Sequence, residues 1–164
     1  MKLLPVILAS LLVGFAGGCR TAEPPPVARP LVARVYLEAL PEQPGTAVTL
    51  PLSRVPLTVD PRALLVESDL AGAVLEPAEF GTVLQLVFTP QAARDLYRRT
   101  AGAQGLRLVL TLNGTAVAAQ RIGDPVTDGA LRFYPEVGAA QLPALLADLR
   151  STIAVVQTKL AQKQ

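Results

Sequence analysis

Few residues in this chain have side chains that could do chemistry. The sequence contains no histidine, so the usual proton shuttle and the commonest metal ligand are missing. A nucleophile needs a base within reach, yet the only lysines beyond residue 18 are Lys159 and Lys163, at the C-terminal end. The 13 acidic residues are scattered, and no glycine-rich phosphate loop follows a predicted strand. We therefore predict no catalytic residue, no metal and no cofactor, and hence a protein that is not an enzyme.

The single cysteine, Cys19, is the one residue with a marked chemical context. It follows a short basic and then apolar run through Phe15, and the residues directly before it are small, in the tetrapeptide Ala16-Gly17-Gly18-Cys19. The run predicts a secretory signal peptide at residues 1–18, because it is short for a membrane span. The tetrapeptide resembles the bacterial lipobox, whose cysteine is lipidated, although Ala16 stands where leucine is usual. The alternative is an uncleaved signal anchor with an incidental thiol, and a lone exported cysteine forms no internal disulfide.

The lipobox resemblance implies that Cys19 carries a fatty acid such as palmitate and anchors the protein to a membrane. Arg20 comes next, and by resemblance to Gram-negative lipoproteins a residue other than aspartate there favours the outer membrane, with the protein facing the periplasm. Residues 19–30 predict a lipidated cysteine and a proline-rich tether, and residues 31–164 predict one domain. Without residues 1–18, the count of Lys and Arg falls from 15 to 14 against 13 acidic residues. This near-neutral charge, with no basic stripe, argues against nucleic acid as a partner.

The elements with the clearest local signals lie between Val83 and Val126. Residues 83–88 form an apolar run bounded by Gly81 and Pro90, which predicts a buried strand. The pair Thr89-Pro90 predicts the N-cap and first residue of a helix that Gly102 and Gly105 end. The apolar face of this helix is expected to hold Ala92, Ala93, Leu96, Tyr97 and Thr100. The cluster Arg94, Arg98 and Arg99 predicts a solvated helix face, and the alternative is a site for phosphate or an acidic partner.

Asn113-Gly114 predicts the two-residue turn of a β-hairpin, because both residues tolerate positive φ. The alternative reading of Asn113-Gly114-Thr115 is a glycosylation acceptor. With a two-residue turn, the expected register pairs Leu112 with Thr115, Leu110 with Val117 and Leu108 with Ala119.

The stretch VLQLVFTPQAARDLYRRTAGAQGLRLVLTLNGTAVAAQRIGDPV, residues 83–126, resembles SecD of the SecD/SecF protein-export family. The matching places are Phe88, Thr100, Gly105, Leu106, Leu108, Val109, Leu110, Gly114, Val117 and Pro125. Residues 129–134 and the helix that follows are similar to the family's next strand and helix, so the likeness covers roughly residues 57–150, the head of the first periplasmic domain. We expect an α+β, ferredoxin-like fold with an antiparallel or mixed sheet of about five strands and two main helices on one face. The family's proton-carrying transmembrane helices have no counterpart, so the resemblance implies a polypeptide-binding ancestry without an export motor.

Two further segments supply candidate contact residues. Residues 31–39 alternate as a first strand with one wet face, whereas residues 46–59 are short apolar pieces broken by proline, which predicts edge strands or extended loop. A partner strand is expected to add along that edge, at Val48, Leu50, Leu52, Val55 and Leu57. The C-terminal segment predicts an amphipathic helix that covers the sheet as far as Ile153. Beyond it the helix either frays or caps the domain edge, or it pairs with another chain through Val155, Val156 and Leu160.

Two functions follow from these expectations. The first is a membrane-anchored periplasmic module that binds an exported polypeptide or another envelope protein, as an accessory to protein export or envelope biogenesis. The alternative is a structural lipoprotein that forms homo-oligomers or joins an envelope complex through its C-terminal helix.

Overall fold

A computed structural model describes residues 30–162, so the predicted signal peptide, Cys19 and nearly all of the predicted tether lie outside the described residues. In chain order the elements are β1 (Ala33–Leu37), β2 (Thr46–Thr49), β3 (Pro56–Val59), β4 (Leu70–Ala78), β5 (Gly81–Phe88), α1 (Pro90–Ala101), β6 (Arg107–Leu112), β7 (Thr115–Arg121), β8 (Ala130–Phe133) and α2 (Leu142–Ala161). Short 3-10 turns precede β4 and α2, at Glu67–Asp69 and Ala139–Gln141. The predicted α+β class is confirmed.

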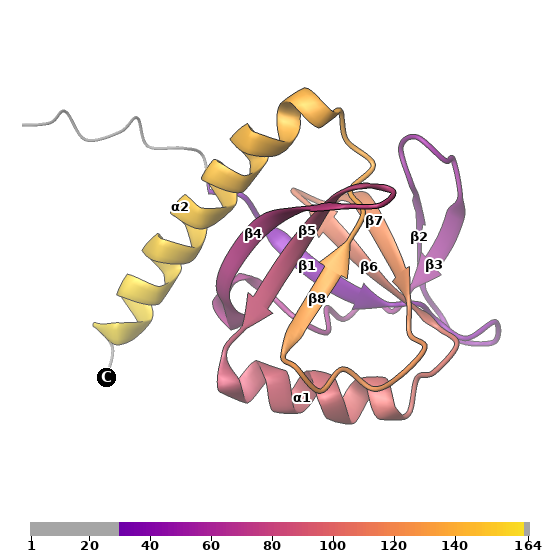
Figure 1. The fold of residues 1–164 in the computed structure, drawn as a ribbon. Coiled ribbons are helices and arrows are strands. Elements are labelled where there is room, and N and C mark those ends of the chain that lie inside the picture. The colour runs from indigo at the N-terminus through magenta and orange to yellow at the C-terminus, as the bar shows by residue number, and fades with distance from the viewer. Residues whose placement is uncertain (1–29, 163–164) are drawn as a thin grey trace, which may run out of the picture.

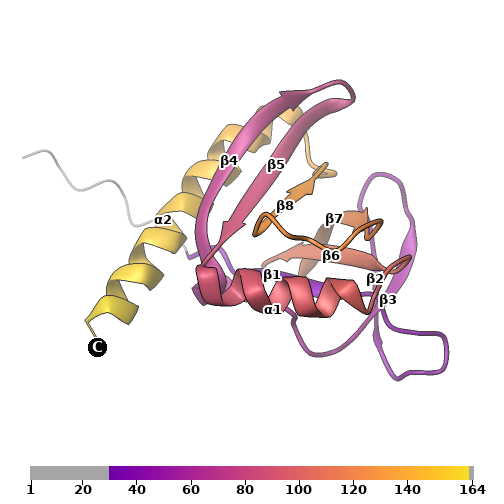
Figure 2. The same ribbon diagram turned by 60° about the horizontal axis from the view of Figure 1, so that its bottom comes forward.

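The strands of the described region form three antiparallel sheets, in the orders β1-β6-β7, β2-β3 and β4-β5-β8 (Figure 1). The expectation of one sheet of about five strands was therefore wrong, and the structure does not confirm the ferredoxin-like arrangement. The two helices also lie apart: α2 runs along β4, whereas α1 lies across the ends of the strands (Figures 1 and 2).

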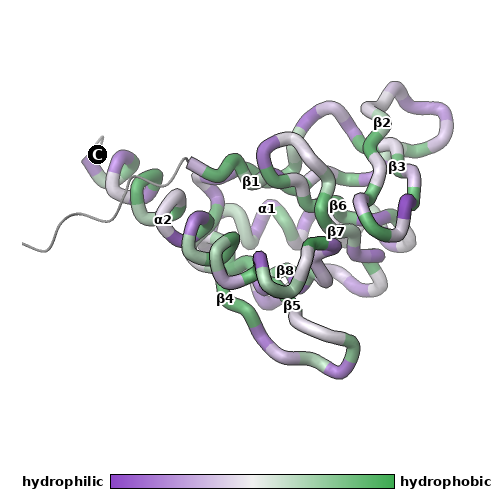
Figure 3. Tube along the Cα trace, turned by 90° about the horizontal axis from the view of Figure 1, so that it is seen from above, coloured by the Kyte–Doolittle hydropathy of each residue, from purple (hydrophilic) through white to green (hydrophobic). Residues whose placement is uncertain are grey.

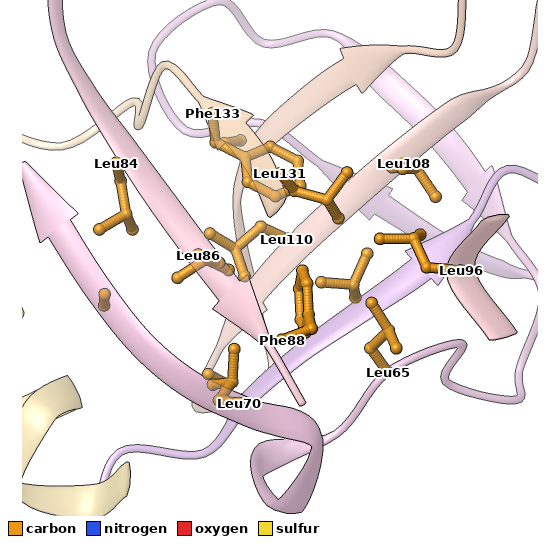
Figure 4. Close-up of a cluster of buried hydrophobic side chains, with 14 of the residues drawn as sticks. Leu65, Leu70, Leu84, Leu86, Phe88, Leu96, Leu108, Leu110, Leu131 and Phe133 are labelled. Atoms are coloured by element: carbon orange, nitrogen blue, oxygen red, sulfur yellow. The ribbon is translucent and has the colours of Figure 1, made fainter. Parts of the chain in front are cut away.

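The main core lies between the two three-stranded sheets, with α1 closing one end (Figure 4). Alternate residues of each strand supply it, as the period of a half-buried strand requires. The largest side chains in it that are almost wholly buried are Leu84, Leu86, Leu96, Leu108, Leu110, Leu131, Phe133 and Leu149. Arg132 and Tyr134 point to the opposite face of β8 from Leu131 and Phe133, as the alternation predicted.

A second, smaller core covers the other face of the β1-β6-β7 sheet. The β2–β3 hairpin packs there, and its members are Leu50, Leu57, Val59, Val109 and Ala116. Strand β3 bonds to the end of β1 and the residues that follow it: Ala39 N–H donates to the Thr58 carbonyl at 2.8 Å, and Asp60 N–H, just after β3, donates to the Leu37 carbonyl at 2.9 Å. The outer edge of β1 is covered by residues 64–65, which hydrogen-bond to Val35. Sheet β1-β6-β7 is thus buried on both faces.

Helix α1 begins where the sequence predicted. The Thr89 hydroxyl accepts a hydrogen bond from Ala92 N–H, Pro90 is the first helical residue, and Gly102 caps the C-terminus. Four of the five expected core residues are buried or half-buried, but Tyr97 is 47% exposed, so its placement on the apolar face was wrong. Tyr97 follows the buried Leu96 by one position, which turns it about 100° away around the helix.

The Asn113-Gly114 turn forms as predicted, with both residues at positive φ. Leu112 pairs with Thr115, but an irregularity between Leu110 and Thr111 shifts the rest of the register by one residue. Leu110 therefore pairs with Ala118 and Leu108 with Gln120, which corrects the two expected pairs with Val117 and Ala119. A bulge of this kind places two residues of one strand against one of the other, and here it puts Val117 and Ala118 into the main core together.

Helix α2 is fastened to β4 by side chains along its length. Arg150 Nε donates to the Ala73 carbonyl at 2.9 Å, and Gln157 Nε2 donates to the Leu70 carbonyl at 2.7 Å. By length and composition alone, the helical segment Ala139–Ala161 could cross a membrane. In the structure its buried face packs on the domain through Leu149 and Ile153, and its C-terminal end projects beyond the strands (Figure 3).

Candidate functional site

Two charged side chains near β8, Glu136 and Arg132, hold neighbouring turns in place. Glu136 Oε2 accepts from the N–H groups of Leu52 and Ser53 at 2.9 and 2.8 Å, which holds the turn of the β2–β3 hairpin. Burial alone would raise the pKa of Glu136, but its hydrogen bonds to Ser53 and Leu52 outweigh burial and lower the pKa. Arg132 Nη1 donates to Asp128 Oδ2 at 2.8 Å and lowers the pKa of Asp128. Within residues 30–162, no group of three or more Cys, Asp or Glu side chains is placed to hold a metal ion.

The predicted partner edge at residues 46–59 is only partly accessible. Leu50 and Leu57 are 6% and 5% exposed, because they pack into the second core. Val48 is half-buried, while Leu52 and Val55 are exposed at 69% and 36%. The backbone edge exists, since β2 pairs only with β3. Its apolar side chains, however, mostly point into the protein rather than toward a partner.

The predicted contact residues on α2 differ in accessibility. Val155 and Leu160 are 49% and 38% exposed, and Val156 is half-buried. All three belong to the part of the helix that follows Ile153, its last fully buried residue. The end of α2 is thus an exposed apolar helix face.

A cleft opens where the edge strands of the two main sheets approach each other. Strands β7 and β8 each pair with one strand only, β6 and β5, and Figure 1 shows β8 lying between β5 and β7. A backbone hydrogen bond joins β7 to the chain that follows β8: Glu136 N–H donates to the Val117 carbonyl at 2.6 Å. Beyond that point lies a cleft of about 520 Å³, which is within the usual size of ligand sites. Its walls are Ala119 and Gln120 of β7, Arg132 and Tyr134 at β8, and Glu76, Pro77, Ala78 and Val83 of the β4–β5 hairpin.

The hydrogen-bonding pattern shows which backbone groups face this cleft. In an antiparallel pair, alternate residues of each strand bond to the partner, and those between them turn their N–H and C=O outward. On β7, Ile122 N–H donates to the Leu106 carbonyl, so the backbone of Gln120, two residues earlier, also bonds to β6. The backbone groups of Ala119 and Arg121, which alternate with these, point away from β6. On β8, the Gly129 carbonyl accepts from Phe88 N–H, so the backbones of Leu131 and Phe133, two and four residues further on, also bond to β5.

The same alternation turns the backbone of Arg132 and Tyr134 away from β5, toward the cleft. Ala130, two residues before Arg132, also turns its backbone away from β5, but its N–H already donates to the Asp128 side chain at 3.1 Å. The first residue of β8 whose outward backbone N–H has no partner within the described chain is therefore Arg132. The cleft is thus bordered by outward backbone donors and acceptors of Ala119 on β7 and of Arg132 and Tyr134 at β8.

Gln120, one of the residues that line the cleft, carries a buried polar group. Its side-chain oxygen is buried and has no hydrogen-bond partner among the described residues. A buried acceptor without a donor costs about 1–3 kcal/mol, so such groups are uncommon in folded proteins. No pattern in the sequence predicted that residues 119–121 and 132–134 lie together. The only local signal was a glutamine that ends an otherwise small, apolar run, Ala116 to Ala119.

Comparisons with known proteins identify the fold. The sequence matches no protein-family model, and a search of curated proteins also found no match. Two solved structures are similar with high probability. One is titled "Structure and function of a membrane component SecDF that enhances protein export"; it has a TM-score of 0.56 at 18% identity and covers 77% of this chain and 63% of that chain. The other, "Crystal structure of SecDF in Super-membrane-facing form", has a TM-score of 0.57 at 18% identity and covers 77% of this chain and 19% of that chain.

This chain therefore spans about three fifths of the first SecDF structure and one fifth of the second. At 18% identity the likeness shows the fold, and it confirms the resemblance to a SecD domain that the sequence indicated.

Proposed function

We propose that this protein is a non-enzymatic, lipid-anchored module of the bacterial cell envelope that binds extended polypeptide or another envelope protein on the periplasmic side. Its role would be accessory to protein export or envelope biogenesis. The observation that carries the proposal is the set of unpaired strand edges, at β2, β7 and β8, on a domain with a SecD-like fold. Unpaired edges offer main-chain hydrogen bonds to any extended segment, whatever its sequence.

Binding of unfolded polypeptide tests the first part of the proposal. The intact protein in detergent micelles is mixed with fluorescein-labelled, reduced and carboxymethylated lactalbumin, and fluorescence anisotropy is measured. Folded lactalbumin with the same label is the control, because its backbone groups are already paired. Binding of the unfolded form alone is expected. Equal binding of both forms, or binding of neither, refutes polypeptide holding.

Attachment to the membrane is tested at Cys19. Cells are grown with radiolabelled palmitate, and the wild-type protein is compared with the Cys19→Ser variant. The label is expected in the mature wild-type protein only, together with a shift of the variant out of the membrane fraction. An unlabelled wild-type protein with an intact first methionine contradicts the lipid anchor.

A second candidate function is assembly through α2, favoured by the exposure of Val155 and Leu160 on its projecting end. Deletion of residues 154–164 is expected to reduce the oligomeric state in analytical ultracentrifugation. The double variant Val155→Ser with Leu160→Ser should do the same, whereas the exposed Lys159→Ser should not. An unchanged sedimentation coefficient in the deletion and the double variant rules out this interface.

A further inference from the structure

We infer that an acidic segment of a bound polypeptide docks in a groove between α1 and the loop that leads from β7 into β8. The groove is shallow, with a volume of about 500 Å³, and its walls are Ala93, Arg94, Tyr97 and Arg98 of α1 and Thr127 of the loop. This inference rests on the proposed function, for which it names a docking site and the charge of the partner. The site is separate from the strand edges, because four of its five residues belong to a helix.

The helical period arranges the lining residues in two rows. Ala93 and Tyr97 are four positions apart, so they lie on adjacent turns of α1, beside its buried face, and supply an apolar floor. Arg94 and Arg98 have the same spacing and form a basic rim next to that floor. Tyr97 is 47% exposed, so a partner can reach it. Tyrosine and arginine are among the residue types that contribute most to protein interfaces.

Contacts within the domain hold the two walls of the groove together. Val126 N–H donates to the Thr100 hydroxyl at 3.0 Å, which fastens the loop to α1 next to Thr127. Gly129 packs so closely on the helix that an added Cβ would lie 2.9 Å from the Ala93 Cβ. Figures 1 and 2 show this loop running along α1. The groove is therefore formed before a partner arrives, which lowers the entropy cost of binding.

The charges at the groove favour an anionic partner. Arg94 forms no ion pair within residues 30–162 and donates to the neutral side chain of Gln91 at 2.6 Å. Arg98 pairs with Asp95 at 3.2 Å, but both side chains are largely exposed, and an exposed pair contributes little. A guanidinium has five N–H donors, so both arginines keep donors for an incoming carboxylate.

The lining selects a polypeptide segment that carries both acidic and apolar side chains. A carboxylate of the partner pairs with Arg94, while a neighbouring apolar side chain covers Ala93 and Tyr97. Inorganic phosphate would use the arginines alone and would leave the apolar floor in contact with water. The occupant is therefore an acidic, partly apolar segment of polypeptide.

The test compares two arginines of the same helix. Arg94→Ala removes a residue that lines the groove, and Arg99→Ala is its matched control. Both variants lose one exposed arginine without an ion pair in the described chain, so they change the net charge equally. Arg99 does not line the groove, because it is turned about 100° around the helix from Arg98. Tyr97→Ala removes the aromatic part of the floor, and circular dichroism checks that all three variants fold.

The probe is a fluorescein-labelled ten-residue peptide of alternating glutamate and leucine, and its binding to the intact protein in detergent micelles is measured by fluorescence anisotropy. Peptides of alternating lysine and leucine, and of alternating glutamate and serine, are expected to bind more weakly. Arg94→Ala should weaken binding of the glutamate–leucine peptide about two- to fivefold, as for one exposed ion pair. Tyr97→Ala should weaken it at least about fivefold, and Arg99→Ala should bind it as the wild type does.

The outcomes separate this inference from the proposed function. If Arg94→Ala and Arg99→Ala bind the glutamate–leucine peptide equally, or if either other peptide binds the wild type as tightly, docking in this groove is refuted. The proposed function then still stands if unfolded lactalbumin binds the wild-type protein, because the strand edges can hold it. If neither the glutamate–leucine peptide nor unfolded lactalbumin binds, both fail.

Discussion

Replacing the buried Thr100 by valine tests how α1 is joined to the loop that leads into β8. Thr100 is wholly buried, and its hydroxyl makes two kinds of hydrogen bond. It donates to the Leu96 carbonyl at 2.8 Å within the helix, and it accepts from Val126 N–H at 3.0 Å. The second bond links α1 to a segment 26 residues further along the chain.

The expected cost comes mainly from the accepted bond. Valine keeps the shape of threonine but leaves the half-buried Val126 N–H without its acceptor; an unpaired donor costs about 1–3 kcal/mol when it is shielded from water, which bounds the expected loss. The Leu96 carbonyl loses little, since it retains its bonding within the helix. For a domain of this size, one kcal/mol moves the thermal midpoint by roughly 3–5 °C, so Thr100→Val should melt about 3–15 °C below the wild type.

The assay is thermal and urea unfolding followed by far-ultraviolet circular dichroism. Thr158→Val is the matched control, because Thr158 makes the same donated bond, to the Ala154 carbonyl at 2.8 Å, on an exposed helix face. Its change should stay within about 0.5 kcal/mol. If Thr100→Val is as stable as the wild type, or if both variants lose the same amount, the bond to Val126 does not contribute as argued.

Two further predictions concern backbone geometry and pH. Gly129 has a φ of +67°, and an added Cβ would lie 2.9 Å from the Cβ of Ala93. Gly129→Ala should therefore lower the free energy of unfolding, measured in urea, by at least about 1–2 kcal/mol. Gly123→Ala is the control and should leave it unchanged, because nothing lies within 4 Å of an added Cβ there. The pKa of Glu136 is lowered in the folded protein by its hydrogen bonds to Leu52 and Ser53. The ionised carboxylate therefore stabilises the fold at pH values above its unfolded pKa, which is near the ordinary value of 4.5. This contribution is lost as the pH falls through the folded pKa. Glu136→Gln should therefore be less stable than the wild type at pH 7, and the gap should narrow toward pH 3; a gap of constant size across that range contradicts the assigned ionisation.

Several features of this protein were determined by residues close together in the sequence. Thr89 and Pro90 begin α1, Asn113-Gly114 forms the hairpin turn, and β8 alternates as its pattern predicted. Each depends on backbone preferences or on bonds that span a few residues, so the local sequence is sufficient to specify it.

Other features depended on contacts between distant segments, and tertiary structure alone decided them. A proline-broken stretch reads as an exposed edge, yet Leu50 and Leu57 are buried, because the far face of β6 and β7 is also apolar and needs a cover. The candidate cleft has the same origin. Whether Ala119 and Arg132 face each other depends on how two sheets pack, and the side-chain period of a strand is the same for an edge as for a paired strand. A chain specifies its strands and turns locally, but the edges that remain open are fixed only when every other strand has found its partner.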